Sequence, residues 1–100
     1  MARSSGNIDA NGGTISDTSN KNGWKVEDHP QGLGHYRIRF SKPFQQVPTV
    51  FVNVINWDAE MEMNTINIGI VPHNDYVDIE LWRNGNYANH SLAFAAFGDV

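Results

Sequence analysis

Alternation of apolar and polar residues from residue 35 to the C-terminus is the feature that most constrains the fold. Five segments carry this period of two: His35–Phe40, Thr49–Trp57, Asn64–Val71, Tyr76–Trp82 and Asn89–Gly98. Successive side chains of a β-strand point to opposite faces, so each segment is typical of a strand with at least one buried face. β-branched and aromatic residues fill these segments, and none repeats apolar residues at helical spacing. The sequence therefore predicts an all-β fold.

Turn-forming residues separate the segments at intervals of about ten residues, which is the spacing of an antiparallel sandwich. Pro43 and Pro48 flank one connection, and the run from Pro72 to Asp75 makes another. The pair Asn84-Gly85 stands between two alternating segments, a strong signal for a two-residue hairpin. We therefore expect an antiparallel β-sandwich of about six strands.

Residues 1–34 differ from the rest because they are rich in Gly, Asn, Ser and Asp. Such residues tolerate turns and left-handed backbone, so they predict loops and short extended pieces that supply one or two strands. Ile8 and the stretch Trp24–Val26 are the apolar points at which this N-terminal arm docks. The 100 residues suit one domain, 1–100, in which the arm 1–34 packs on the sandwich strands of 35–100.

Composition excludes several classes of function. The net charge is −4 and the pI about 5.4, which disfavours nucleic acid and anionic membrane surfaces as partners. The absence of cysteine excludes a thiol nucleophile, a zinc ribbon and a disulfide framework. The first residues lack the apolar core of a signal peptide, and every apolar stretch is too short to span a bilayer. We expect a cytoplasmic protein by default, or a secreted one if a signal has been removed.

Motifs for catalysis and for metal binding are missing, so we expect no enzyme, no cofactor and no metal. The sequence holds no glycine-rich phosphate loop, no Gly-x-Ser-x-Gly elbow and no His-Glu-x-x-His, and its four histidines lie on different segments. Two acidic groups remain as alternatives. Asp78 and Glu80 share a strand face, which suits a divalent ion or a polysaccharide hydrolase, although a solvated face is the favoured interpretation. The acidic turn of Asp58, Glu60 and Glu62 suits calcium, but lacks the spacing of an EF-hand.

The segment from Trp82 to Tyr87 is the most suggestive part of the chain. It places an aromatic residue at the end of a strand, followed by Arg83, Asn84, Asn86 and Tyr87 at a hairpin tip. Saccharides need this combination, because their C–H faces stack on aromatic rings while their hydroxyls need directional partners. The alternative is that Trp82 covers the end of the sandwich and the asparagines only shape the turn.

Apolar residues on both faces of Thr49–Trp57 predict an additional covered surface. Phe51, Ile55 and Trp57 lie opposite the valines of this segment, and Phe97 adds to the second face of the last one. Either the N-terminal arm covers these side chains, or they form a subunit interface, because large exposed apolar patches are rare on soluble monomers. The polarity of the arm favours a homo-oligomer.

Loose motifs spread over most of the chain resemble one known family. They are Gly6-Asn7-Ile8-Asp9, Gly23-Trp24, a strand ending in Phe40, Pro43-Phe44 with Pro48, a turn with Asp58, a strand led by Asn64, and Trp82 before a final strand of small residues. In this layout the chain resembles the H-type lectin domain of the snail agglutinins and of the discoidin C-terminal domain. Trimeric phage tail-fibre and appendage domains share a similar Phe-x-x-Pro-Phe-x-x-x-Pro-x-Val spacing.

The resemblance implies a six-stranded antiparallel sandwich that forms homotrimers, or multiples of them. Sugars of the N-acetylgalactosamine type would be bound between subunits without catalysis. By position, Trp82 would stack on the sugar, and Arg83, Asn84, Asn86 and Asp28 would supply hydrogen bonds. The chain departs from the family at Arg83, where a His is frequent, at Ile66, where an Arg is expected, and in having no cysteines. The alternative function is a structural or assembly domain of a trimeric appendage or phage tail-like protein.

Overall fold

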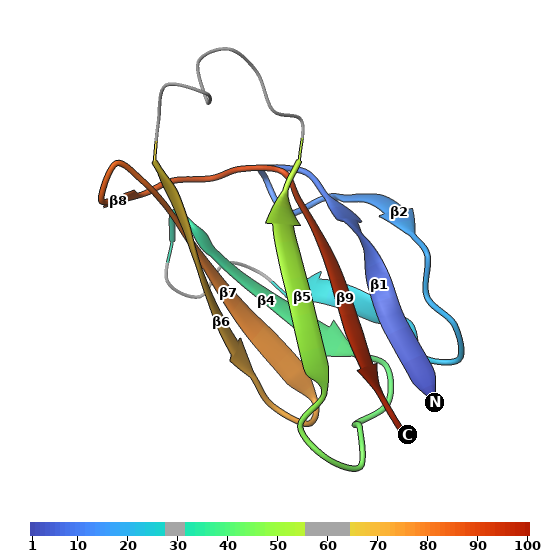
Figure 1. Cartoon of the computed structure of the whole chain (residues 1–100). Coiled ribbons are helices and arrows are strands. Elements are labelled where there is room, and N and C mark those ends of the chain that lie inside the picture. Colours follow the sequence, from blue (N-terminus) through green and yellow to red (C-terminus); the bar gives the residue numbers. More distant parts are fainter. Residues whose placement is uncertain (28–31, 56–64) are drawn as a thin grey trace.

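The computed structural model describes residues 1–27, 32–55 and 65–100. Within them the chain forms strands and turns, and Figure 1 shows the strands in two layers. The strands are β1 (Ala2–Ile8), β2 (Thr14–Asp17), β3 (Trp24–Glu27), β4 (His35–Phe40), β5 (Thr49–Val54), β6 (Ile66–Pro72), β7 (Tyr76–Arg83), β8 (Asn86–Tyr87) and β9 (Leu92–Gly98). No helix in the described part of the chain is long and apolar enough to cross a membrane.

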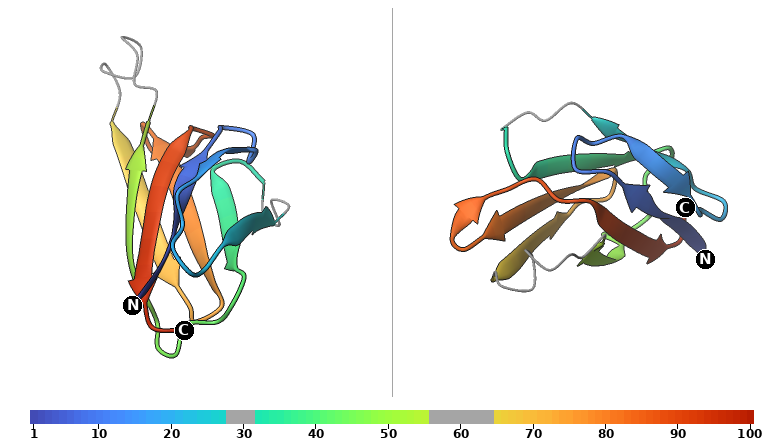
Figure 2. Two further views of the ribbon diagram at one scale, coloured as in Figure 1. Left: turned by 90° about the vertical axis from the view of Figure 1, so that its right-hand side faces the viewer. Right: turned by 90° about the horizontal axis from the view of Figure 1, so that it is seen from above.

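Two antiparallel sheets face each other, as the two views of Figure 2 show. Sheet A has the strand order β2-β1-β9-β5. Sheet B has the order β3-β4-β7-β6, with β8 paired to β7 at one end. The predicted all-β antiparallel sandwich is confirmed. Its strands outnumber the six expected because β2, β3 and β8, of four, four and two residues, are too short to show a period.

The core lies between the sheets and combines inward residues of the alternating segments with Ala2, Ile8, Trp24 and Phe44. Its most deeply buried side chains are Ile8, Tyr36, Ile38, Val77, Ile79, Leu81 and Leu92. The two possible orientations of the last strand are resolved, since Leu92, Phe94 and Ala96 are buried and Ala93, Ala95 and Phe97 face outward. Val50, Val52 and Val54 of β5 pack against the same core.

β1 is an inner strand of sheet A, whereas the composition of residues 1–34 predicts loops and short extended pieces. It pairs with β9 over seven residues, from Ala2 opposite Gly98 to Ile8 opposite Leu92. Its small inward residues admit a large neighbour. The ring of Trp24 lies over Gly6, its indole N–H donates to the carbonyl of Ser5 at 2.8 Å, and its ring meets Phe94 edge-on at 4.9 Å. Trp24 and Ile8 therefore dock this region, as expected.

Half of the predicted strand ends agree with the structure. β4 has the predicted bounds, and β7 extends one residue beyond them to Arg83. β9 begins at Leu92, three residues later than expected. The side chain of Asn89 instead accepts a hydrogen bond from the N–H of Gly34 at 2.8 Å. β5 ends at Val54, before the predicted end at Trp57, and Ile55 already lies outside the strand. β6 begins at Ile66 and not at Asn64, and it extends to Pro72, one residue beyond the predicted end. Residues 56–64 lie outside the described residues.

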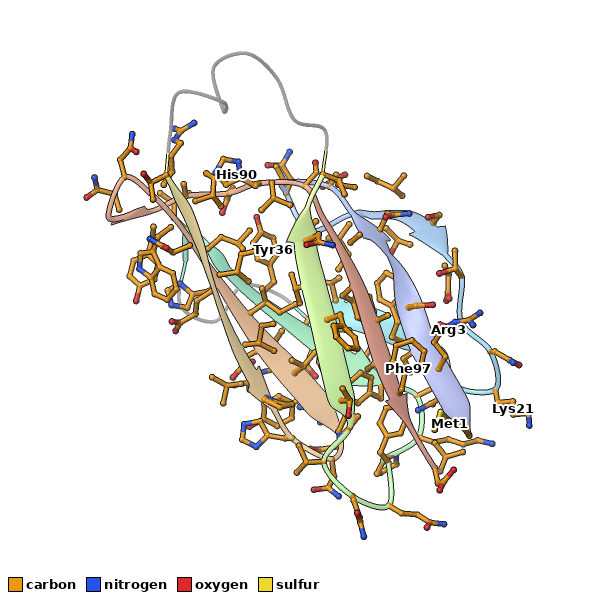
Figure 3. The ribbon with its side chains drawn as sticks, in the orientation of Figure 1. Met1, Arg3, Lys21, Tyr36, His90 and Phe97 are labelled. Carbon is orange, nitrogen blue, oxygen red and sulfur yellow. The ribbon has the colours of Figure 1, made fainter. Side chains whose placement is uncertain are left out.

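Phe51 remains exposed on the outer face of sheet A. Its side chain is 61% exposed and meets Phe97 edge-on, with ring centroids 6.2 Å apart. Figure 3 shows Phe97 and Arg3 on this sheet, where they are register partners. The N-terminal region pairs with the far side of β9 through β1 and does not cover Phe51. Of the two explanations for the apolar second face, cover by the arm therefore fails for this residue.

The two chain ends lie together at one end of sheet A, and the β7–β8 hairpin lies at the other end of the molecule (Figure 1). Antiparallel pairing of the first and last long strands causes this, because Ala2 is opposite Gly98. The N-terminal ammonium group is 3.4 Å from the carboxylate of Asp99. Both groups are exposed, so this ion pair contributes little to stability.

Candidate functional site on the outer face of sheet B

The outer face of sheet B collects the polar and aromatic side chains that alternate with core residues on β4 and β7. β4 contributes His35, Arg37 and Arg39, and β7 contributes Tyr76, Asp78, Glu80 and Trp82. The register places His35 opposite Glu80 and Arg37 opposite Asp78. Arg37 and Asp78 therefore form a cross-strand pair of opposite charges, an arrangement that stabilises a sheet surface.

Three rings form a platform at the hairpin end of this face. Trp82 and Tyr87 are register partners across the Asn84-Gly85 turn, and their rings stack with centroids 5.2 Å apart and planes at 29°. The ring of His35 contacts the ring of Tyr87, and their centroids are 4.4 Å apart. We call His35, Trp82 and Tyr87 the aromatic platform. Gly69 leaves room for it, because a Cβ at this position would lie 3.1 Å from the indole ring of Trp82.

The turn residues have the backbone that such a hairpin requires. Asn84 and Gly85 both have positive φ, 51° and 84°, as in the two-residue turns that match strand twist. The side-chain oxygen of Asn84 accepts a hydrogen bond from the backbone N–H of Thr65 at 2.9 Å. The backbone N–H of Asn84 donates to the carbonyl of Thr65, also at 2.9 Å. Asn84 therefore shapes the turn and ties it to the start of β6.

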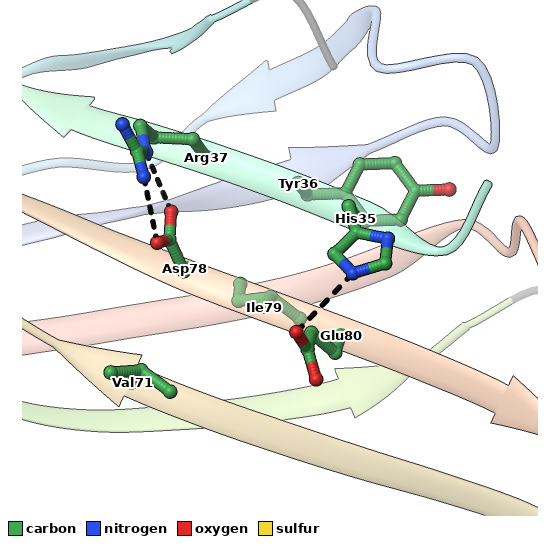
Figure 4. A pocket seen from close by; sticks show the side chains of 7 residues that line it. All are labelled: His35, Tyr36, Arg37, Val71, Asp78, Ile79 and Glu80. Carbon is green, nitrogen blue, oxygen red and sulfur yellow. Dashed lines mark hydrogen bonds and ion pairs between the residues drawn. The ribbon is translucent and has the colours of Figure 1, made fainter. Parts of the chain in front are cut away.

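Figure 4 shows polar groups around His35, the β4 member of the platform. The Nε2 atom of His35 is 3.2 Å from the Oε1 atom of Glu80. The Nδ1 atom of His35 is 2.9 Å from the carbonyl oxygen of Leu33, within hydrogen-bonding distance. A shallow pocket of about 90 Å³ lies next to this pair, over β4, β7 and Val71 of β6. The site thus offers flat apolar rings beside a carboxylate and an imidazole.

Asp78 and Glu80 are each engaged by a basic residue of β4. Both carboxylate oxygens of Asp78 accept from Arg37, at 2.7 and 2.9 Å, and this bidentate bond raises the pKa of Arg37 above its ordinary value. Glu80 faces His35. Each carboxylate therefore has a partner on β4, Arg37 for Asp78 and His35 for Glu80. The described residues contain no group of three metal-ligating side chains, and the turn of Asp58, Glu60 and Glu62 lies outside them.

The far end of the same face carries a second charged cluster, away from the platform. Arg39 is hydrogen-bonded to Glu27 and lies 3.1 Å from Asp75, and its guanidinium holds the pKa of Glu27 below the ordinary value. Arg37 and Arg39 both lie over the ring of Tyr76, 4.3 and 5.1 Å from its centre. These groups neutralise one another, which is typical of a solvated sheet face.

The residues predicted to contact a ligand fall on different sides of the hairpin. Trp82 belongs to the aromatic platform, and Asn84 supports the turn. Arg83 and Asn86 are register partners of each other, one position along from Trp82 and Tyr87, so strand alternation directs them to the opposite face. Asp28 lies outside the described residues.

Tyr87, His35 and Glu80 complete the site and were not among the predicted contacts. A signal for Tyr87 existed in the sequence, because a two-residue Asn-Gly loop pairs the residues on either side and so sets Tyr87 opposite Trp82. His35 and Glu80 are 45 residues apart in the sequence, and the pairing of β4 with β7 brings them together. No local pattern specifies that register.

Comparison with protein-family models, with curated proteins and with solved structures finds no match to this chain.

Proposed function

We propose that the chain is a non-catalytic carbohydrate-binding domain that receives a sugar ring on the aromatic platform. The observation that supports this most directly is the stacked pair of Trp82 and Tyr87 with Glu80 and His35 beside it. A pyranose presents C–H groups on its faces and hydroxyls on its rim, so it needs a flat apolar surface bordered by hydrogen-bonding groups. Asn67, exposed and opposite Trp82 on β6, adds an amide to that border.

The resemblance to H-type lectins supplies the finer part of the proposal. It suggests a ligand of the N-acetylgalactosamine type and a trimer with its sugars bound between subunits. The aromatic platform comes from a single chain, so each copy holds one primary contact surface, and a neighbouring copy would add to it. An oligomer carrying several weak sites would gain avidity on a surface dense in glycans.

The Trp82→Ala variant is expected to weaken glycan binding at least about tenfold, the equivalent of about 1.4 kcal/mol, because it removes the stacking surface. A glycan array identifies the sugar, and titration calorimetry with that sugar measures the affinity. Asn86→Ala is the matched control on the opposite face of the hairpin and should bind as the unaltered chain does. An array without any signal, or full binding by Trp82→Ala, contradicts the proposal. Loss of binding in Asn86→Ala would move the site to the other face.

A second candidate is a structural or assembly domain, and exposed Phe51 beside Phe97 on sheet A favours it. Such a domain would use this face to join copies or to contact another protein, and the platform would touch protein instead of sugar. Light scattering combined with the glycan screen separates the two functions. A stable oligomer without any response to sugar favours assembly.

A further inference from the structure

The open edge of β5 differs from the other sheet edges among the described residues. β2 and β3, at the opposite edges of the two sheets, have four residues each and include charged ones, and the pairing of β2 contains an irregularity at Asn7 and Ile8. β6 includes Gly69 and ends at Pro72, which has no N–H. β5 spans six residues, Thr49–Val54, without charge, proline or glycine. Natural edge strands usually carry such features because an unprotected edge pairs with another strand.

The hydrogen-bonding pattern shows which backbone groups face that edge. The N–H of Ile55 donates to the carbonyl of Ser91 at 2.9 Å, and the register continues this pair as Asn53 with Ala93 and Phe51 with Ala95. Hydrogen-bonded and non-hydrogen-bonded pairs alternate in an antiparallel ladder. The N–H and C=O groups of Val50, Val52 and Val54 therefore point away from β9, toward the open edge.

The side chains around this edge are also uncharged. The outward residues of β5 and β9 are Thr49, Phe51, Asn53, Ala93, Ala95 and Phe97. Phe51, at 61%, is among the most exposed large apolar side chains of the described residues. The charges of the sandwich gather instead on the outer face of sheet B, in the pairs of β4 with β7. Depletion of charge around an apolar centre is the composition of an interface core.

We propose that β5 pairs antiparallel with β5 of a second copy about a two-fold axis, which joins the two copies of sheet A into one continuous sheet. With the axis at Val52, each copy sets Val50 opposite the second copy's Val54. All the edge-facing N–H and C=O groups of the three valines then find partners. Two copies of an uncharged strand bring no like charges together, and the contact is isologous, so it closes at two chains. The charged, four-residue β2 at each outer edge ends the sheet.

In this register Phe51 of each copy stands directly opposite Asn53 of the other, on the outer face of the joined sheet. This cross-strand pair is of the non-hydrogen-bonded type, in which side chains approach most closely. Two double variants therefore test the register. Phe51→Lys with Asn53→Lys sets like charges opposite each other twice in the dimer. Phe51→Lys with Asn53→Glu sets opposite charges there and differs at one position only.

Sedimentation velocity of the unaltered chain should give a dimer. The dimer dissociation constant of Phe51→Lys with Asn53→Lys should be at least about tenfold higher than that of Phe51→Lys with Asn53→Glu. Added salt should narrow this difference because it screens the charges. Circular dichroism checks that both variants fold. A monomer or a trimer for the unaltered chain overturns the proposal, as do two variants with equal dissociation constants.

Amide hydrogen exchange of the unaltered chain gives a test that needs no variant. The amides of Phe51 and Asn53 should be protected at every protein concentration, because they bond to β9. Those of Val50, Val52 and Val54 should gain protection as the concentration rises, because no described strand pairs with this edge and a partner strand would cover it. Rapid exchange of these three amides at all concentrations would overturn the pairing. Neither experiment involves a sugar, so a failure of the pairing leaves sugar binding at the aromatic platform unaffected. A confirmed dimer replaces the trimer that the lectin resemblance suggests.

Discussion

Gly6→Ala is expected to destabilise the fold by about 3 kcal/mol, the upper part of the range for overpacking a core. A Cβ at Gly6 lies 2.3 Å from the carbonyl oxygen of Ser16 and 2.4 Å from Cζ2 of Trp24. Neither neighbour yields easily. Ser16 belongs to a paired strand, and Trp24 is fixed by its hydrogen bond to Ser5 and its contact with Phe94. The lower entropy of the unfolded alanine variant offsets at most about 1 kcal/mol.

Thermal and urea denaturation followed by circular dichroism measure this effect, which corresponds to a fall in melting temperature of about 12–24 °C. Gly23→Ala is the matched control. Its added methyl group meets only the side-chain oxygen of Ser41, at 3.1 Å, and this side chain can rotate away. We expect the control to stay within about 1 kcal/mol of the unaltered chain. Equal stabilities for the two alanine variants would show that Trp24 does not pack over β1 as described.

Alkaline pH is expected to remove about 2–3 kcal/mol of stability through Tyr36 alone. Burial raises the pKa of Tyr36 from 10.0 to about 12. Its hydroxyl donates to the carbonyl of Ala10 at 2.8 Å, near His90 at one end of the core (Figure 3). Because the folded-state pKa lies above the unfolded one, the protonated phenol favours folding. That contribution is complete below about pH 10 and is lost as the pH rises to about 12.

Urea denaturation between pH 8 and 12 gives the free energy of unfolding, and Tyr36→Phe isolates this residue from lysines and other groups that titrate in the same range. The variant should be less stable than the unaltered chain near pH 8, since it loses the hydrogen bond to Ala10. The gap between the two should narrow steadily above pH 10. A gap that does not change with pH would mean that the phenol ionises equally in the folded and unfolded chains.

Strands with regular alternation could be predicted from the sequence, and those built from small polar residues could not. β4 has the predicted bounds because Tyr36, Ile38 and Phe40 make one apolar face. β1 buries serines and Gly6 to admit Trp24, so its inward face carries no apolar signal except at its ends. The residues of β1 are small because they must leave room for the ring of Trp24, which is far along the sequence but packs against this strand.

Part of the candidate site could likewise be predicted from local sequence, and part of it could not. Trp82 and the hairpin follow from local sequence, because the Asn84-Gly85 pair specifies the turn. The partner of Trp82 on that hairpin, Tyr87, follows from the turn geometry once the loop length is known. The contact of His35 with Glu80 depends on the register between β4 and β7, which the packing of the whole core sets. The polar border of the platform could therefore not be placed by reading along the chain.

Because the two chain ends lie close together, the domain can be attached to other protein segments at one end of the sandwich. Because Ala2 is opposite Gly98 while the β7–β8 hairpin lies at the other extremity, the module can be spliced into a surface loop of a host protein without stretching that loop. Copies of it can equally be joined in tandem by short linkers. In either format the ring-bearing tip points outward, away from the point of attachment.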